Sequence, residues 1–224
     1  MTEISVFDVD RTLTIRPTYS AFLIFAIMRL APWRLLLLPV LITVALAYVL
    51  KLVPRRKMKE VMHRLALGQR IDRQRIEPVA AAFVERLAAG GVYPQAHALV
   101  AADRADGRRL MLATAAPALY IAPLAERLAI ADVVASHGRW DGEVLCSDIL
   151  DENCYGPAKR RMLDAWLASS GIARDEANIR FYSDHASDLP TFEWADEAVA
   201  VNPSPELRVI AAQRGWQVLD WRKA

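Results

Sequence analysis

The sequence predicts an α/β fold with a parallel central sheet and an inserted helical subdomain, on three observations. Short apolar segments of strand character alternate with helical segments from about residue 92 onwards, and this alternation is typical of parallel sheets covered by helices. A first strand, "EISVFD" at residues 3–8, precedes that alternation. The helical segment 16–91 lies between the two, so we expect it to be an insertion into the core.

Apolar periodicity and helix start and stop residues place the elements in order. The insertion contains four segments of helical character, at residues 19–31, 34–51, 55–68 and 72–91. Later helices are predicted at 93–107, 116–130, 156–172, 188–195 and 205–215. Strands are predicted at 109–114, 132–137, 179–184, 197–202 and 216–221, with a hairpin around Asp141 and Gly142.

Composition and charge exclude several classes of protein. The two cysteines, Cys146 and Cys154, are too few for a disulfide framework and suit a reducing compartment such as the cytoplasm. The net charge is only +2, yet residues 29–75 hold eleven basic and two acidic residues. The basic run "RRKMK" at 55–59 has no interleaved aromatic residues, so we expect no nucleic-acid partner.

Polar side chains gather where the predicted strands end. Asp8 and Asp10 follow the first strand, Thr114 ends the strand at 109–114, and Asp184 ends the strand at 179–184. Ligands of open α/β sheets bind at the carboxyl ends of the strands. Clustered carboxylates need positive charge, which Lys159 and a hard cation such as Mg²⁺ would supply. Such a site suits phosphoryl transfer.

Four motifs stand in these segments between Asp8 and Asp188, namely "DVDRT", "LMLATAAP", "CYGPAK" and "FYSDHASDLP". In sequence and in order they resemble the motifs of the haloacid dehalogenase (HAD) superfamily, in its phosphoserine-phosphatase-like branch. The resemblance implies a Rossmann-like catalytic core formed by residues 1–15 and 92–224. It also implies that residues 16–91 are the helical cap that this branch inserts.

The resemblance further implies a role for each matched residue in a phosphatase. Asp8 would be the nucleophile that forms an aspartyl-phosphate, and Asp10 would donate and accept protons. Thr114 and Lys159 would bind the phosphoryl oxygens.

The remaining matched positions concern the metal and its surroundings. Mg²⁺ would be bound by Asp8, the backbone carbonyl of Asp10 and Asp184, while Asp188 would orient Lys159 or a metal-bound water. Arg11 stands where the family commonly has glycine. It is expected either to add positive charge for phosphate binding or to pack outward.

The insertion holds an uncharged run, "LLLLPVLITVALAYVL" at residues 35–50. The run is shorter than an ordinary membrane span, which needs about 17–25 residues. Both flanks of the insertion must reach one catalytic site, so a single span is excluded and only a hairpin with residues 19–31 remains. Three interpretations stay open: contact with an anionic membrane surface beside the basic run 55–59, a homodimer interface, or an ordinary buried cap.

The apolar cap also bears on the substrate. A phosphorylated lipid or another amphiphilic phosphomonoester fits such a cap, and the cap is similar in character to that of bacterial phosphatidylglycerophosphate phosphatases of the same branch. The alternatives are a soluble phosphatase of small molecules such as phosphoserine, or a catalytically inactive, membrane-associated binding protein of the same fold. We expect a cytoplasmic protein. An apolar cap would favour a peripheral or monotopic position at the inner face of the membrane.

Overall fold

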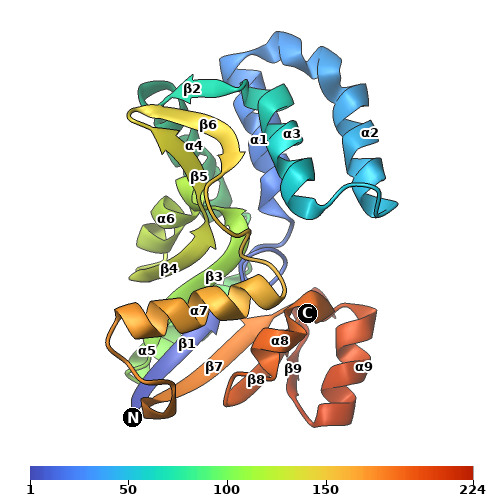
Figure 1. The fold of residues 1–224 in the computed structure, drawn as a ribbon. Helices are drawn as coiled ribbons and strands as arrows, with labels where there is room; N and C mark the ends of the chain where they lie inside the picture. Colours follow the sequence, from blue (N-terminus) through green and yellow to red (C-terminus); the bar gives the residue numbers. More distant parts are fainter. Residues whose placement is uncertain (224) are drawn as a thin grey trace.

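The central sheet of the computed structural model, which describes residues 1–223, has six parallel strands in the order β4-β3-β1-β7-β8-β9 (Figure 1). The predicted α/β class with a parallel, Rossmann-like sheet is therefore confirmed. The strands are β1 (Thr2–Phe7), β3 (Arg109–Pro117), β4 (Asp132–Ser136), β7 (Ala177–Ser183), β8 (Glu197–Val201) and β9 (Gln217–Leu219).

Helices cover both faces of this sheet, which is why its strands read as apolar runs. One face packs on α5 (Pro94–Ala105) and α6 (Ala118–Arg127), and Phe7, Leu110 and Leu112 point into this layer. The other face packs on α7 (Pro157–Ser169), α8 (Leu189–Phe192) and α9 (Pro205–Arg214), where Ile4 and Val6 are buried. The sheet is thus held rigidly, which fixes the positions of its strand ends.

The insertion forms a helical layer beyond the carboxyl edge of the sheet (Figure 1). Its elements are α1 (Thr18–Leu30), the 3-10 turn η1 (Pro32–Leu37), α2 (Leu38–Val49), α3 (Arg55–Leu67) and α4 (Arg73–Ala88). The single helix expected at 34–51 is divided, because Pro39 lacks the N–H of a helix interior and instead stands in the first turn of α2.

A small second sheet was not foreseen from the sequence. It has the order β2-β6-β5, and antiparallel pairs join β2 (Arg70–Asp72) to β6 (Val144–Ile149) and β6 to β5 (Gly138–Asp141). The expected hairpin around Asp141 is present, but its strand β6 also pairs with the insertion. The division of the chain into core 1–15 and 92–224 and cap 16–91 stays a prediction, and the structure adds a second segment to the cap side.

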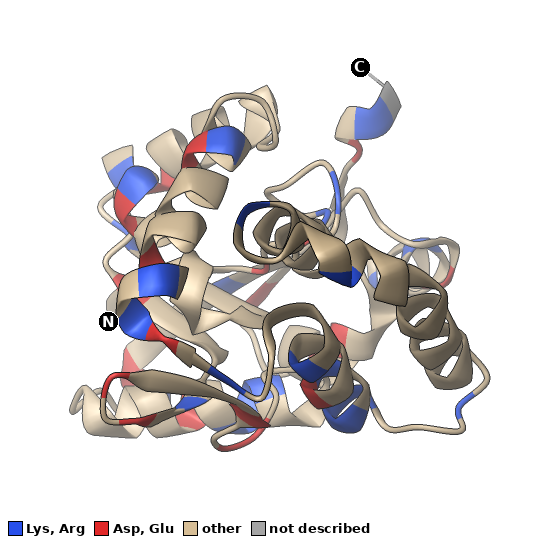
Figure 2. Cartoon of the chain, turned by 90° about the horizontal axis from the view of Figure 1, so that it is seen from above, with Lys and Arg blue, Asp and Glu red and all other residues tan. Residues whose placement is uncertain are grey.

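Charged residues are unevenly placed on the insertion. In Figure 2 the ribbon of α2 carries neither blue nor red, whereas α1, η1 and the loop after α2 carry blue segments and no red. The sequence has no Asp or Glu from residue 11 to residue 59. This part of the surface is therefore apolar and cationic.

Candidate active site

The predicted site residues meet at the carboxyl edge of the sheet. β1 lies between β3 and β7, with Phe7 opposite Leu112 on one side and Tyr182 on the other. Asp8, directly after β1, therefore lies between the end of β3 and the end of β7. One cavity of about 510 Å³ is lined by all seven residues singled out from the sequence, namely Asp8, Asp10, Arg11, Thr114, Lys159, Asp184 and Asp188.

A buried ion-pair cluster forms the floor of this cavity. The ammonium of Lys159 donates to Asp8 Oδ1 at 2.8 Å and to Asp188 Oδ2 at 2.6 Å. Ser183 Oγ donates to the same oxygen of Asp188 at 2.7 Å. Gly156 precedes α7 with φ of 58°, a left-handed conformation that glycine adopts at little cost. This turn begins the helix that carries Lys159 into the site.

The pKa values of two carboxyl groups of the site, Asp8 and Asp184, are raised, which favours their neutral forms. Burial raises the pKa of Asp8 to about 6, against the opposing effect of the Lys159 charge. Burial and the neighbouring charges of Asp8 and Asp188 raise the pKa of Asp184 to about 8. The pKa of Lys159 is raised, because the charges of Asp188 and Asp8 outweigh its loss of hydration. The cluster thus holds more negative charge than one lysine neutralises.

The donor set fits Mg²⁺. Asp188 Oδ1 is buried and accepts no hydrogen bond within the part of the chain that the structure describes. Across residues 1–223, no three or more His, Cys, Asp or Glu side chains converge closely enough to enclose a metal ion. Mg²⁺ does not need such an enclosure, since one or two carboxylates with water and phosphate oxygens complete its octahedron. Asp8 and Asp184 meet that requirement.

Asp10 is fixed by the first helix of the insertion. Its Oδ1 accepts hydrogen bonds from the backbone N of Thr18 at 2.8 Å and from Thr18 Oγ1 at 2.7 Å. The Thr18 hydroxyl also lies 3.0 Å from the hydroxyl of Tyr120. Sequence reasoning missed Thr18 and Tyr120, which carry no motif signal. Together they orient the carboxyl group of Asp10 towards the cavity that Asp8 also faces.

Arg11 and Thr114 complete the cavity on either side of Asp8. Arg11 has φ of 63°, which explains why glycine suits this position, and its carbonyl accepts from Asn202 Nδ2 at 3.1 Å. Its exposed side chain lines the cavity. Thr114 is buried, and its Oγ1 accepts from the backbone N of Ala116 at 3.2 Å. β3 continues past Thr114 to Pro117, with a register irregularity against β4.

The insertion contributes residues to the cavity that sequence reasoning did not single out. Tyr48 and Val49 from the end of α2 and Arg55 from the start of α3 line the same space, together with Tyr155 from the loop before α7. The Arg55 guanidinium lies 4.1 Å from the ring centroid of Tyr155, and its Nη1 donates to the Tyr48 hydroxyl at 3.2 Å. Arg55 Nε is buried without a hydrogen-bond partner among the described residues.

Lys59 is the second basic residue that the sequence did not distinguish. It lies one helical turn after Arg55, it is buried, and it donates to the carbonyl of Ala115 and to Asn153 Oδ1, the latter at 2.7 Å. Burial lowers the pKa of Lys59 to about 7. The spacing of Arg55 and Lys59 in the run "RRKMK" was the only available signal for this pair.

Known proteins match this chain in sequence. The profile of the haloacid dehalogenase-like hydrolases matches residues 5–193. The inhibition of morphological differentiation protein of Streptomyces azureus is 28% identical over 173 residues, which are 75% of this chain and 59% of that protein. A histidinol-phosphatase of Neisseria meningitidis is 28% identical over 138 residues, 58% of this chain and 60% of that protein. The chain thus spans less than two thirds of these relatives.

Solved structures match the fold over nearly the whole chain. A Bordetella pertussis protein of unknown function superposes with a TM-score of 0.90 at 24% identity, over 98% of this chain and 99% of the other. A substrate-bound phosphoserine phosphatase superposes with a TM-score of 0.67 at 15% identity, over 100% and 96% of the two chains. At these identities the likeness concerns the fold.

Proposed function

Because the chain belongs to the haloacid dehalogenase-like hydrolase family and has the fold of its phosphoserine-phosphatase-like branch, we propose that it hydrolyses phosphomonoesters through a phosphate carried on Asp8. The observation that carries this proposal is the buried cluster of Lys159 with Asp8 and Asp188 at the carboxyl edge of the sheet. The cluster places a carboxylate nucleophile beside a fixed positive charge, and carboxylates of this kind form covalent phosphoryl intermediates.

The reaction divides into two displacements on phosphorus. An oxygen of Asp8 attacks phosphorus while the bond to the leaving-group oxygen breaks, and Asp10 donates its proton to that oxygen. The Asp10 carboxylate then accepts a proton from a water molecule, whose oxygen attacks the phosphorus of the aspartyl-phosphate. The bond to Asp8 breaks, inorganic phosphate leaves and the carboxylate of Asp8 is regenerated. Thr114 and Lys159 hold the phosphoryl oxygens during both displacements.

Mg²⁺ would be held by the Asp8 and Asp184 carboxylates and the backbone carbonyl of Asp10. When bound, the ion would neutralise charge on the phosphoryl group, which is the main requirement of phosphoryl transfer. Asp188 accepts a second hydrogen bond from the ammonium of Lys159 and so helps to hold it beside Asp8. Arg11, exposed at the cavity, adds a positive charge that attracts the phosphate of an incoming substrate.

For the substrate we propose an amphiphilic phosphomonoester, with a lipid phosphate as the specific case, and a peripheral position of the enzyme at the cytoplasmic face of a membrane. The apolar residue Val49 and the ring of Tyr48 form one wall of the cavity, which favours an apolar leaving group. A soluble phosphatase of small molecules such as phosphoserine is the second candidate, favoured by the shared fold. A catalytically inactive binding protein is disfavoured by the complete set of Asp8, Asp10 and Lys159.

Hydrolysis of an aryl phosphate with and without Mg²⁺ tests the reaction, and Asp8→Asn should abolish it. Asp164→Asn is the matched control, because this carboxyl group on α7 is 44% exposed and pairs with Arg160 at 3.7 Å. Turnover by the Asp8→Asn variant at the wild-type rate would refute the mechanism. A substrate panel with phosphatidic acid in vesicles, phosphoserine and sugar phosphates then separates the two substrate classes.

A further inference from the structure

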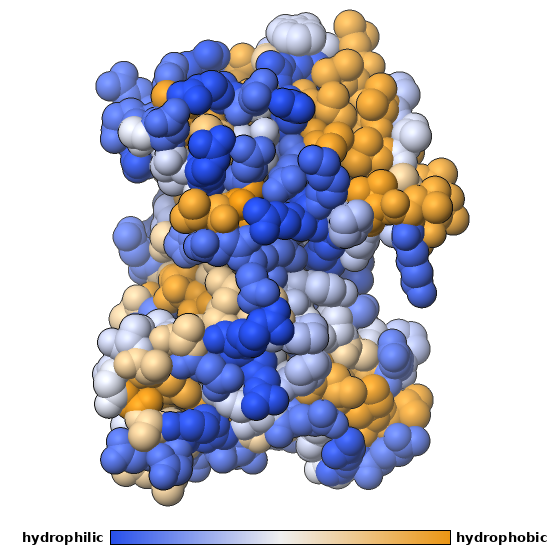
Figure 3. Space-filling view, in the orientation of Figure 1, coloured by the Kyte–Doolittle hydropathy of each residue, from blue (hydrophilic) through white to orange (hydrophobic). Residues whose placement is uncertain are grey.

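The insertion has an exposed apolar face beside the catalytic cavity. The 18 residues Pro32–Val49 are apolar and long enough for a membrane span, yet only 6% of them are buried. Large side chains of η1, α2 and the following loop are exposed to solvent, and these are Trp33, Leu36, Val40, Ile42, Leu46, Val49, Leu50 and Leu52. Figure 3 shows an orange area over α2. An apolar area of this extent marks an interaction surface.

The geometry of α2 suits a helix that lies on a bilayer. Its opposite side packs on the rest of the insertion, with Leu41 buried and Leu38, Val44 and Tyr48 partly buried. α2 itself has 12 residues and extends about 18 Å, so only together with η1 does the run approach the roughly 30 Å of the hydrocarbon core. The packing of its other side on the insertion keeps α2 from being surrounded by lipid. A helix packed along one side and apolar along the other is typical of interfacial, monotopic binding.

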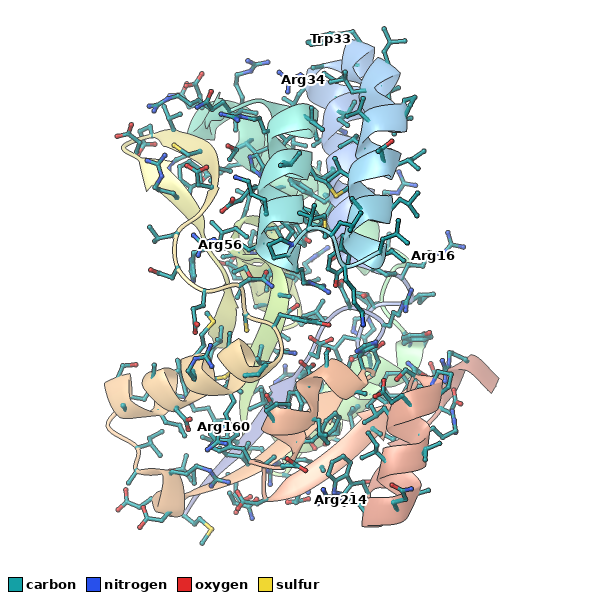
Figure 4. All side chains as sticks on the ribbon, turned by 45° about the vertical axis from the view of Figure 1, so that its right-hand side comes forward. Arg16, Trp33, Arg34, Arg56, Arg160 and Arg214 are labelled. Atoms are coloured by element: carbon teal, nitrogen blue, oxygen red, sulfur yellow. The ribbon has the colours of Figure 1, made fainter. Side chains whose placement is uncertain are left out.

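Charge identifies the kind of surface that complements this face. Arg16, Arg29, Arg34 and Lys51 form no ion pair with any carboxylate in residues 1–223, and no acidic residue lies between residues 11 and 59. Figure 4 shows Trp33 and Arg34 at the far end of the insertion and Arg16 near the opposite end of α2. Apolar side chains between unpaired cations complement anionic lipid headgroups above an acyl layer.

The apolar face reaches the mouth of the catalytic cavity. Val49 lines the cavity and is also 69% exposed, so one residue belongs to both surfaces. Leu50 and Leu52 follow it with 59% and 74% exposure, and Lys51 between them is exposed. Apolar residues around a single lysine suit the headgroup region, where the apolar stem of the lysine is buried and its ammonium stays in water. Arg55, with its unpartnered Nε, stands on the cavity wall behind this tip.

We infer that the α2 tip, residues 46–52, inserts into the headgroup region of an anionic phospholipid bilayer and seats the mouth of the catalytic cavity on it. A lipid phosphate then reaches Asp8 from the bilayer through this mouth, past the positive charge of Arg55. The substrate part of the inference rests on the proposed phosphatase function. The docking part does not, because it follows from the exposed apolar tip and the unpaired cations alone.

Single-cysteine labelling tests docking without reference to activity. The natural cysteines Cys146 and Cys154 are buried, so a polarity-sensitive fluorophore attaches to an introduced cysteine. We expect Leu52→Cys and Leu46→Cys labels to show a blue-shifted emission on vesicles containing phosphatidylglycerol, and a weaker shift on phosphatidylcholine vesicles. A label at Val209→Cys, 56% exposed on α9, serves as the control and should not respond. Equal responses at all three positions would overturn the inference. A blue shift that appears without vesicles when the protein concentration is raised would also overturn it, in favour of a homodimer.

A charge placed at the tip tests access to the cavity. For each variant, turnover of phosphatidic acid in anionic vesicles is divided by turnover of a soluble aryl phosphate. We expect this ratio to fall at least tenfold for Leu52→Glu and to stay at the wild-type value for Val209→Glu. An unchanged ratio for Leu52→Glu would overturn access through the tip. If the wild-type protein hydrolyses no aryl phosphate, the proposed function fails, and the fluorescence still decides whether the tip docks.

Discussion

The buried ammonium of Lys59, on helix α3 of the insertion, donates a hydrogen bond to the carbonyl of Ala115 at the end of β3. Ala115 follows Thr114, and the same ammonium donates to Asn153 in the segment before α7. Lys59 therefore joins the insertion to the two core segments that carry Thr114 and Lys159. This link holds α3 against the core segments that line the cavity.

Replacing Lys59 by methionine should lower kcat/KM for an aryl phosphate by about tenfold, because a small displacement of phosphate-binding groups is costly in transition-state stabilisation. Lys57→Met is the matched control, since that side chain is 65% exposed on the same helix. Steady-state kinetics measure the effect, and limited proteolysis of the insertion reports its release from the core. Wild-type kcat/KM in the Lys59→Met variant would show that the link has no part in catalysis.

Acid should destabilise the protein partly through His63 on α3. Burial lowers the pKa of His63 to about 4, whereas an unfolded histidine titrates near 6.5. Between these values the unfolded chain binds the proton and the native protein does not, so the free energy of unfolding falls as pH falls from 6.5 to 4. The loss is at most about 3 kcal/mol.

His63→Gln removes this titration. Urea unfolding at pH 7 and pH 4.5 should therefore show a smaller loss of stability in the variant than in the wild type. A wild-type protein that loses no more stability than the variant over this interval would contradict the neutral state of His63 in the fold.

The strand ends at Asp8 and Asp184 could be predicted because apolar runs stop there, and parallel topology brings such ends together. The end predicted at Thr114 was too early, since β3 continues to Pro117. The strand β2 could not be predicted. Its three residues, Arg70–Asp72, include one apolar side chain, and the strand exists only through its pairing with β6.

The contribution of the insertion to the site was also hidden in the sequence. A basic run on a helix normally faces solvent, and only tertiary packing decides that Lys59 is buried while Lys57 is exposed. Thr18 likewise has no motif, and its hydrogen bonds to Asp10 follow from where α1 starts. The proposed reacting groups follow from local sequence, whereas the groups that surround them follow from the packing of the insertion.

Magnesium affinity should rise between pH 6 and pH 8. Burial raises the pKa of Asp184 to about 8 and that of Asp8 to about 6, so protons compete with the metal for these carboxylates below those values. Competition by the Asp184 proton weakens binding by about 50-fold at pH 6 relative to pH 8, because half of the Asp184 carboxyl groups are already protonated at pH 8. Titration calorimetry in buffers of different ionisation enthalpy measures both the affinity and the protons released. Asp184→Asn should lose most of the affinity, and a dissociation constant that does not change with pH would contradict the competition.

Variants at Arg11 distinguish the effect of backbone strain from the effect of positive charge at the mouth of the cavity. A φ of 63° destabilises a non-glycine residue by about 1 kcal/mol, and Arg11→Gly removes this strain. Because glycine also loses more conformational entropy on folding, we expect the free energy of unfolding to rise by only about 0.5 kcal/mol. If the guanidinium attracts the substrate phosphate, KM should rise severalfold in Arg11→Gly while kcat changes little, and Arg11→Lys should restore KM because it keeps the charge. Urea unfolding and steady-state kinetics on one aryl phosphate measure both effects. A KM that is equal in all three proteins would assign Arg11 to the turn alone.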